Sequence, residues 1–241
     1  MINSTLPMFI LALDTATNAG GLALSRNSEV IGVLMCKTPL NYAERLLDWI
    51  DFLLKQHDIG INDIGCFAVA AGPGSFTGLR IGVAAAKAFG QASGRPVIAL
   101  SSLEALAFRF RQMSSLVASM VDARRQQIYG AVYETNGKEP KLRVHEQVSR
   151  PEEWLRSLPN EAYLFVGDGA LLYRSTILNL MPGARVAESD NCILRELCQL
   201  AYLRYTEGVH TDARSVKANY LRPPDVKLHS ARGSDVTGRK S

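Results

Sequence analysis

The segment from Gly72 to Gly82, GPGSFTGLRIG, contains the residues of this chain that most clearly could do chemistry. It follows an apolar run, residues 66–71, and precedes an expected helix that opens near Leu79. Glycines permit backbone angles and close approaches that side chains forbid, and a helix N-terminus carries positive potential, so such a turn can approach an anion such as phosphate. The residues that would serve a phosphate are Gly72, Gly74, Ser75, Thr77 and Gly78. A plain strand-to-helix connector has the same composition, and the segment matches neither GxxxxGK[ST] nor GxGxxG, so both interpretations stay open.

Two aspartates follow apolar strands at equivalent places in the chain. Asp14 precedes a turn at Asn27 by 13 residues, and Asp122 precedes a turn at Asn136 by 14 residues. In a kinase or ATPase, such an aspartate would act as a base or anchor magnesium. The alternatives are structural: Asp14 as the cap of its own turn, and Asp122 in an ion-pair cluster with the arginine pair 124–125.

The elements that would position these residues alternate between strands and helices, and the order repeats. The first cycle is predicted as strands 8–13, 21–25 and 30–36, helix 42–56, strand 66–71, helix 79–92, strand 97–100 and helix 103–110. The second is predicted as strands 115–121 and 128–133, a strand toward 148, a helix from 151, strand 163–166, a helix, and helix 193–205. Repetition of a three-strand unit with an aspartate at its first strand predicts an α/β fold with two similar lobes.

Composition indicates a globular protein and excludes several classes. The chain has 241 residues, of which 47% are hydrophobic and 21% charged, which suits one large domain or two of modest size. No apolar run reaches the roughly 18 residues of a membrane span, so we expect a cytoplasmic protein with no membrane partner. The four cysteines form no CxxC pair and are expected to be buried free thiols. The four histidines are scattered without HxxxH or HExxH spacing, which indicates no metal site.

The helix expected over residues 42–56 has apolar side chains over an arc of roughly 220°, whereas one core needs about 100°. The helix after the glycine-rich turn is apolar nearly all round as well. We therefore expect these helices to present a face to another protein, although complete burial within the chain would explain the same pattern. The candidate interface residues are Tyr42, Leu46, Trp49, Ile50, Leu53, Arg80 and Lys87.

Six blocks of the chain resemble the TsaB (YeaZ) family. They are LALDTAT, AERLL, GPGSFTGLRIG, SSLEALA, VDARRQQIYGAVY and YLRPPD, and they span residues 11–225 in the usual order. The resemblance implies the duplicated actin-like ATPase fold (ASKHA, RNase H-like). It also implies an accessory subunit that pairs with the catalytic subunit TsaD, and with TsaE supports threonylcarbamoyl transfer to adenosine 37 of tRNA. Alone, such a subunit should form a homodimer through the face it offers TsaD. Tyr42 departs from the family, which commonly has histidine there.

The resemblance also implies that this chain is not the catalyst. TsaD holds its metal with the two histidines of an HLEGH block, and the matching segment here, residues 102–106, reads SLEAL. The Gly167-Asp168-Gly169 turn stands where catalytic relatives have a longer adenosine-binding loop. We expect no cofactor to be required by this chain, with ATP or ADP possible in the assembled complex. The weak or vestigial nucleotide-binding residues would be Asp14, Thr15, Gly72, Gly74, Ser75, Thr77 and Gly78.

Two other functions remain as alternatives. One is an independent actin-fold ATPase or small-molecule kinase that uses Asp14 and the Gly72–Gly78 loop. The other is a peptidase, which the sequence disfavours because Ser75 lies outside any GxSxG elbow.

The chain is expected to divide into an N-terminal extension 1–7, an N-terminal lobe 8–112, a C-terminal lobe 113–225 and a basic tail 226–241. From residue 214 onward there are seven basic and two acidic residues, a net charge of +5. This segment either contacts tRNA electrostatically or is simply solvated.

Overall fold

The structure is a computed structural model that describes residues 7–36, 42–113, 115–210 and 212–222. The expected basic tail, and all of the expected N-terminal extension except Pro7, lie outside the described residues.

The first lobe is built on a five-stranded sheet in the order β3-β2-β1-β4-β5. Its strands are β1 (Phe9–Asp14), β2 (Gly21–Arg26), β3 (Glu29–Met35), β4 (Ile64–Gly72) and β5 (Val97–Ser101). The first three strands form an antiparallel meander, and β4 and β5 run parallel to β1. Asn27 adopts a left-handed conformation (φ 55°) in the turn between β2 and β3, as its side chain permits.

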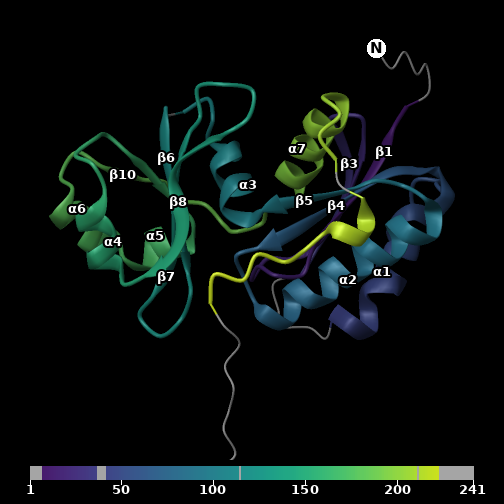
Figure 1. The fold of residues 1–241 in the computed structure, drawn as a ribbon, viewed down its shortest axis with the longest axis horizontal. Coiled ribbons are helices and arrows are strands. Elements are labelled where there is room, and N and C mark those ends of the chain that lie inside the picture. The colour runs from purple at the N-terminus through teal and green to yellow at the C-terminus, as the bar shows by residue number, and fades with distance from the viewer. Residues whose placement is uncertain (1–6, 37–41, 114, 211, 223–241) are drawn as a thin grey trace, which may run out of the picture.

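The second lobe repeats this topology. Its sheet has the order β10-β9-β6-β7-β8, in which β6, β7 and β8 form the antiparallel meander and β9 runs parallel to β6. The strands are β6 (Leu116–Asp122), β7 (Ile128–Glu134), β8 (Lys141–Ser149), β9 (Leu164–Val166) and β10 (Arg185–Val186). The predicted duplicated α/β fold with two similar lobes is therefore confirmed, and Figure 1 shows the lobes side by side.

The first lobe has three layers, with its sheet between helices on both faces. Successive residues of a strand point to opposite faces, so both faces of the sheet can be apolar and be covered by helices. Leu11 and Leu13 face α1 (Tyr42–Lys55) and α2 (Phe76–Ser93), while Ile10 and Ala12 face α7 (Leu194–Thr206) on the opposite side of the first sheet. Helix α3 (Ser102–Arg109) contacts strands of both sheets. The second sheet is covered by α4 (Pro151–Ser157), α5 (Asp168–Leu172) and α6 (Arg174–Leu180), and two short 3-10 helices occupy Ile61–Asp63 and Ala213–Ser215.

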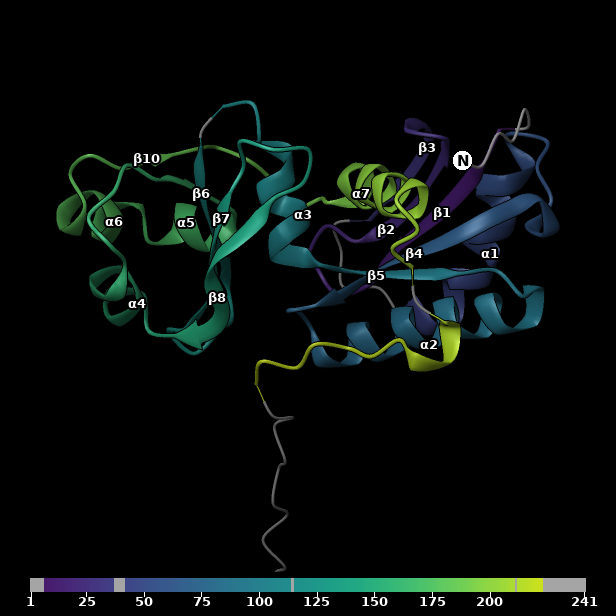
Figure 2. The same cartoon turned by 45° about the horizontal axis from the view of Figure 1, so that its top comes forward.

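Helix α7 packs on the first lobe, although the expected domain boundaries place it in the second. The sequence predicts one C-terminal lobe over residues 113–225, but α7 packs against all five strands of the first sheet (Figures 1 and 2). The apolar face that includes Ile10 and Ala12 has to be covered, and α7 provides Leu197 and Cys198, both fully buried, for that purpose. The chain after α7 then runs beside α2.

The residues of α1 that we expected to form a partner face are mostly buried within the chain. Four of the five candidates on α1, Tyr42, Leu46, Ile50 and Leu53, are no more than 9% exposed, and the last three pack in the core under the first sheet. Trp49 is half-buried and packs edge-on against Tyr42, with ring centroids 5.9 Å apart. These side chains are occupied by the chain itself because β2 and β3 contact this side of the helix.

The large apolar side chains that α1 does expose are Leu47 (65%) and Phe52 (55%). Helix propensity and periodicity do not distinguish them from the buried ones, because the arc of apolar residues was too wide to show which part faces the sheet. None of the helices in the described residues has the length and apolar character needed to cross a bilayer.

Candidate functional site

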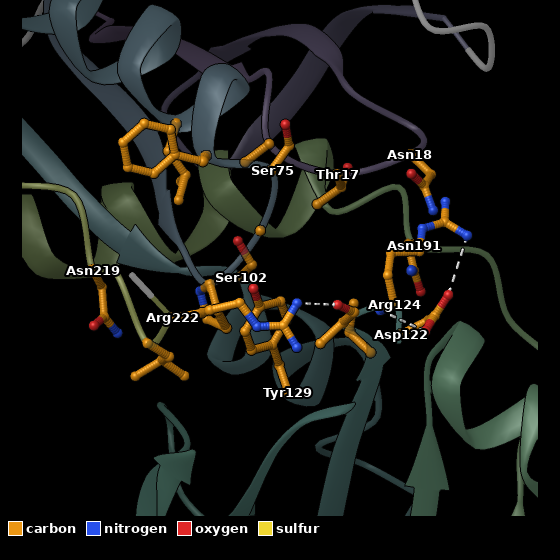
Figure 3. A pocket seen from close by; sticks show the side chains of 18 of the residues that line it. Thr17, Asn18, Ser75, Ser102, Asp122, Arg124, Tyr129, Asn191, Asn219 and Arg222 are labelled. Atoms are coloured by element: carbon orange, nitrogen blue, oxygen red, sulfur yellow. Dashed lines mark hydrogen bonds and ion pairs between the residues drawn. The ribbon is translucent and has the colours of Figure 1, made fainter. Parts of the chain in front are cut away.

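A cleft of about 380 Å³ lies between the two lobes. Its wall combines the loop after β1, the glycine-rich turn, the first turns of α3, the loop after β6 and the C-terminal residues 219–222 (Figure 3). The loops after β1 and β6 come from equivalent places in the two lobes, because each follows the central strand of its sheet. The duplicated topology therefore creates this cleft.

Asp14 does not line the cleft but caps its own loop. The side chain is fully buried, and its Oδ1 accepts hydrogen bonds from the backbone N–H groups of Ala16 (2.9 Å) and Thr17 (3.1 Å). Its Oδ2 accepts from the Thr17 hydroxyl. Burial raises the pKa of Asp14, an effect that these hydrogen bonds partly offset. Of the two roles considered for Asp14, the structure places it as a turn cap.

The ring of Tyr42 lies behind this loop. A Cβ added at Gly20 would meet both the backbone oxygen of Asp14 and the hydroxyl of Tyr42, at 2.4 and 2.6 Å. Burial, followed by the nearby charge of Asp14, raises the pKa of Tyr42 to about 12. Tyr42 is therefore an un-ionised packing residue at the back of the Asp14 loop.

The glycines of the GPGSFTGLRIG segment are needed by packing within the chain. A Cβ at Gly78 would lie 1.9 Å from the backbone oxygen of Thr15, and one at Gly74 would lie 2.8 Å from that of Ala16. The Thr15 hydroxyl donates to the backbone oxygen of Gly78 at 2.6 Å, and Ser75 N–H donates to Ala16 O at 2.9 Å. The loop after β1 thus covers the side of the turn that the glycines leave free.

The remaining residues of the turn have structural partners or face solvent. Gly72 has φ +114°, and a Cβ there would meet the backbone oxygen of Asn219 at 2.6 Å. Ser75 is the N-cap of α2, and its Oγ accepts from Gly78 N–H at 3.3 Å. Thr77 is exposed. The structure therefore favours the connector interpretation for the backbone of this segment, while Gly74 and Ser75 still line the cleft.

The loop after β6 has an unusual backbone that the sequence did not reveal. Residues 124–126 all adopt left-handed conformations, with φ between 53° and 62°. Asp122 Oδ1 accepts from Arg124 N–H at 2.8 Å, and its Oδ2 pairs with the exposed Arg124 guanidinium at 3.2 Å. Arg222 stabilises the same loop by donating to the backbone oxygen of Ala123 (2.8 Å) and to Gln127 Oε1. Of the two roles considered for Asp122, the structure shows the ion pair, with Arg124 as the partner.

The Gly167-Asp168-Gly169 turn is packed tightly against the end of β6. A Cβ at Gly167 or Gly169 would lie 2.6 or 2.8 Å from the backbone oxygen of Met120. Asp168 Oδ1 accepts from Asp122 N–H at 2.9 Å, and its own N–H donates to Asn191 Oδ1 at 3.0 Å. The turn therefore lies against β6 and outside the cleft lining, although Asn191 itself lines the cleft.

Helix α3 places residues 102 and 106 on the cleft. Ser102 and Leu106 both line it, and both are buried in its wall. The Ser102 hydroxyl has no hydrogen-bond partner within the described residues. Glu104, between them, points away and bonds to the Arg204 guanidinium on α7; burial raises the pKa of Glu104, and Arg204 opposes that shift. In the described part of the chain, no three His, Cys, Asp or Glu side chains are grouped so that they could hold a metal ion.

A half-buried carboxylate, Glu146, lies beside the cleft, and no sequence motif marks it. Glu146 on β8 accepts from the Tyr133 hydroxyl at 2.7 Å, from the Ser101 hydroxyl and, through Oε2, from Asn219 Nδ2 at 2.6 Å. Burial, with Glu146 second, raises the pKa of Tyr133. The donors come from both lobes and from the C-terminal segment, and no local sequence pattern links residues so far apart.

Comparisons with known proteins agree on the relatives of this chain. A family model described as TsaD, tRNA N6-adenosine threonylcarbamoyltransferase, matches residues 22–202. The tRNA threonylcarbamoyladenosine biosynthesis protein TsaB of Bacillus subtilis is 34% identical over 176 residues, which cover 72% of this chain and 77% of that protein. TsaB of Haemophilus influenzae is 32% identical over 231 residues, 88% of this chain and 93% of the relative. The structure of YeaZ from Pseudomonas aeruginosa superposes with a TM-score of 0.75 at 28% identity and covers 89% of this chain and all of that one.

Proposed function

The chain belongs to the TsaB (YeaZ) family, whose members are involved in threonylcarbamoyladenosine modification of tRNA, and on that premise we propose that it acts as a non-catalytic activator of a TsaD transferase. In this role it pairs with TsaD, and the pair works with TsaE on tRNA. No cofactor is required by this chain, and ATP or ADP is handled by the assembled complex.

The observation that carries the proposal is the pair of side chains on α3 that face the cleft. At the two positions that match the histidines of HLEGH, this chain has Ser102 and Leu106. A hydroxyl and an isobutyl group cannot replace two imidazole ligands. A metal-assisted transfer therefore has no ligand pair at this place.

Two further features support a non-catalytic role. Asp14, the residue that an actin-fold kinase would use, has its carboxylate engaged by the backbone of its own loop. The glycine-rich turn has its open side covered by Thr15 and Ala16, which reduces the backbone surface that a phosphate could reach. Both features disfavour the independent ATPase or kinase.

The face proposed for TsaD is revised to the exposed side of α1 and α2. It consists of Leu47 and Phe52 on α1 with Arg80, Ala84 and Ala88 on α2. Small side chains such as Ala84 and Ala88 let a partner helix approach closely, and exposed Leu and Phe supply apolar area. A second copy of this chain would use the same face, so the homodimer and the pair with TsaD compete.

The experiment combines binding and activity. The purified chain is titrated into TsaD from the same organism, and tRNA modification is measured with TsaE, ATP and the threonylcarbamoyl donor. We expect no modification and no ATP turnover by the chain alone, and stimulation of TsaD when it is added. ATP turnover or tRNA modification by the pure chain would contradict the proposal.

Charge substitutions locate the interface. About 55% of the surface of Phe52 is exposed, which for a phenylalanine corresponds to roughly 110 Å² and about 2.5 kcal/mol of apolar burial. Phe52→Glu should therefore weaken binding to TsaD about 100-fold or more. Leu172→Glu is the matched control, because Leu172 is 61% exposed on α5 in the other lobe. Equal affinities of the two variants would place the interface elsewhere.

A further inference from the structure

The described chain ends in a segment that crosses from the first lobe to the second. Val216 is buried in the core between the first sheet and the α1 and α2 layer. Three residues later, Asn219 N–H donates to Ala71 O at the end of β4 (2.7 Å), and its side chain reaches Glu146 on β8 (2.6 Å). One residue is thus bonded to both lobes. We call residues 216–222 the strap.

Glu146 is the point at which the strap and both lobes meet. Its Oε1 accepts from Ser101, the last residue of β5 and the N-cap of α3, and from Tyr133 on β7. Its Oε2 accepts from Asn219. A carboxylate with this number of donors holds its neighbours more strongly than neutral hydrogen bonds do. Removing the carboxylate would release the strap and the first lobe from β8 together.

The end of the strap is attached to the second lobe. Tyr220 packs against Phe76 at the start of α2, with ring centroids 4.9 Å apart, so it still belongs to the first lobe. Arg222 bonds to Ala123 O and to Gln127 Oε1, on the two sides of the left-handed turn after β6. Three consecutive non-glycine residues in that conformation are costly and need support from their surroundings. Arg222 provides that support from outside the lobe.

The two sides of the cleft are held by different kinds of contact. On the α3 side, one apolar core extends across both lobes and includes Leu106 of α3 with Val117 and Tyr133 of the second sheet. Arg204 of α7 adds an ion pair to Glu139 at 3.1 Å. On the strap side, the described contacts to the second lobe include hydrogen bonds of Asn219 and Arg222, two residues that Figure 3 shows at the cleft. Ser101 and Asn18 of the first lobe add hydrogen bonds to Glu146 and, at 3.3 Å, to Asp168. Replacing a hydrogen bond by hydrogen bonds to water costs much less free energy than exposing a buried apolar core.

We propose that the strap is a releasable clasp that closes the cleft. Glu146 on the second lobe is the residue that binds the strap, and α3 is the hinge between the lobes. When the hydrogen bonds of Asn219 and Arg222 to the second lobe break, the two lobes rotate apart. The rotation is about α3, because the apolar core around α3 stays packed. Residues 219–222 themselves form part of the cleft wall, so release also removes that wall. The clasp acts within this chain and does not depend on TsaD.

The test measures the distance between the lobes in the full chain. Spin labels are attached to cysteines introduced at Gln56 on the first lobe and Asn160 on the second, both exposed, with Cys36 and Cys192 replaced by serine. Native Cys66 and Cys198 are buried and stay unlabelled. The unmodified strap should give one narrow distance distribution. The double variant Asn219→Ala/Arg222→Ala should add a second population at a longer distance between the lobes. We expect the fraction of molecules in this population to be about tenfold or more larger than in the chain with the unmodified strap, because hydrogen bonds with charged groups are lost.

The matched control is Arg143→Ala/Arg174→Ala, which removes two exposed ion pairs that lie within the second lobe. It should leave the distance distribution unchanged. Glu146→Ala is an independent variant that removes the Asn219 contact but leaves those of Arg222, so it should give a second population at the same longer distance but of smaller size. If both variants show the single narrow distribution, the strap does not hold the lobes and the proposal is wrong. If both variants instead unfold, as judged by circular dichroism, the strap belongs to the core and is no clasp.

Discussion

Replacing Gly78 with alanine tests whether the glycine-rich turn serves packing within the chain. Gly78 lies in the first turn of α2, where local helix propensity favours alanine over glycine by about 1 kcal/mol. In the folded chain, however, the added Cβ would lie 1.9 Å from the backbone oxygen of Thr15. Real Cβ contacts are much longer, so α2 or the loop after β1 has to move.

The size of the effect follows from what that movement breaks. The Thr15 hydroxyl would lose its 2.6 Å hydrogen bond to Gly78 O, and overpacking of this kind costs about 1–3 kcal/mol. Adding about 1 kcal/mol for the buried hydrogen bond and subtracting the gain of about 1 kcal/mol in helix propensity, we expect a net loss of about 2 kcal/mol. In a chain of this length that lowers Tm by about 4–8 °C, whereas helix propensity alone would raise it by about 2–4 °C.

The assay is thermal unfolding followed by circular dichroism, with two control variants. Gly183→Ala places a Cβ where no atom lies within 4 Å and should change Tm little. Gly94→Ala also meets no atom, but Gly94 is the left-handed C-cap of α2 (φ +66°), so a loss of about 1 kcal/mol is expected. If Gly78→Ala is as stable as Gly183→Ala, the close approach of Thr15 does not constrain the turn and this reasoning fails.

Three further substitutions test the Asp14 loop and the orientation of α1. Burial raises the pKa of Asp14 in the folded chain above its value in the unfolded chain, which is about 4. Between these two pKa values the folded chain keeps a proton on Asp14 that the unfolded chain releases. The contribution of Asp14 to stability therefore falls as pH rises through this range. Asp14→Asn should therefore gain stability relative to the parent chain over this range in urea unfolding; a constant difference would show that Asp14 is ionised throughout. Leu53→Glu buries a charge at a position 5% exposed and should unfold the chain, whereas Phe52→Glu should leave Tm nearly unchanged. Equal Tm values for these two variants would contradict the observed orientation of α1.

Local sequence patterns were sufficient for most of the elements and for their repetition, but they missed β10 and the division of one expected helix into α5 and α6. Alternating apolar residues, turn residues such as Asn27 and caps such as Ser101 act over a few positions, so they can be interpreted without the rest of the chain. The Ser101 hydroxyl, for example, caps α3 by accepting from the N–H groups of Leu103 and Glu104, two and three positions further along the chain. The absence of histidine at residues 102 and 106 was also visible directly.

Tertiary structure alone decided which of the open interpretations holds at each site. Gly78 is required by Thr15, a residue 63 positions away, and nothing in the turn itself distinguishes that contact from a phosphate. Likewise, the burial of Leu53 and the exposure of Phe52 depend on how α1 sits against β2 and β3, and the placement of α7 depends on an open face of the first sheet. Periodicity specifies that a helix has an apolar side, but only the neighbours supplied by distant segments determine what covers it.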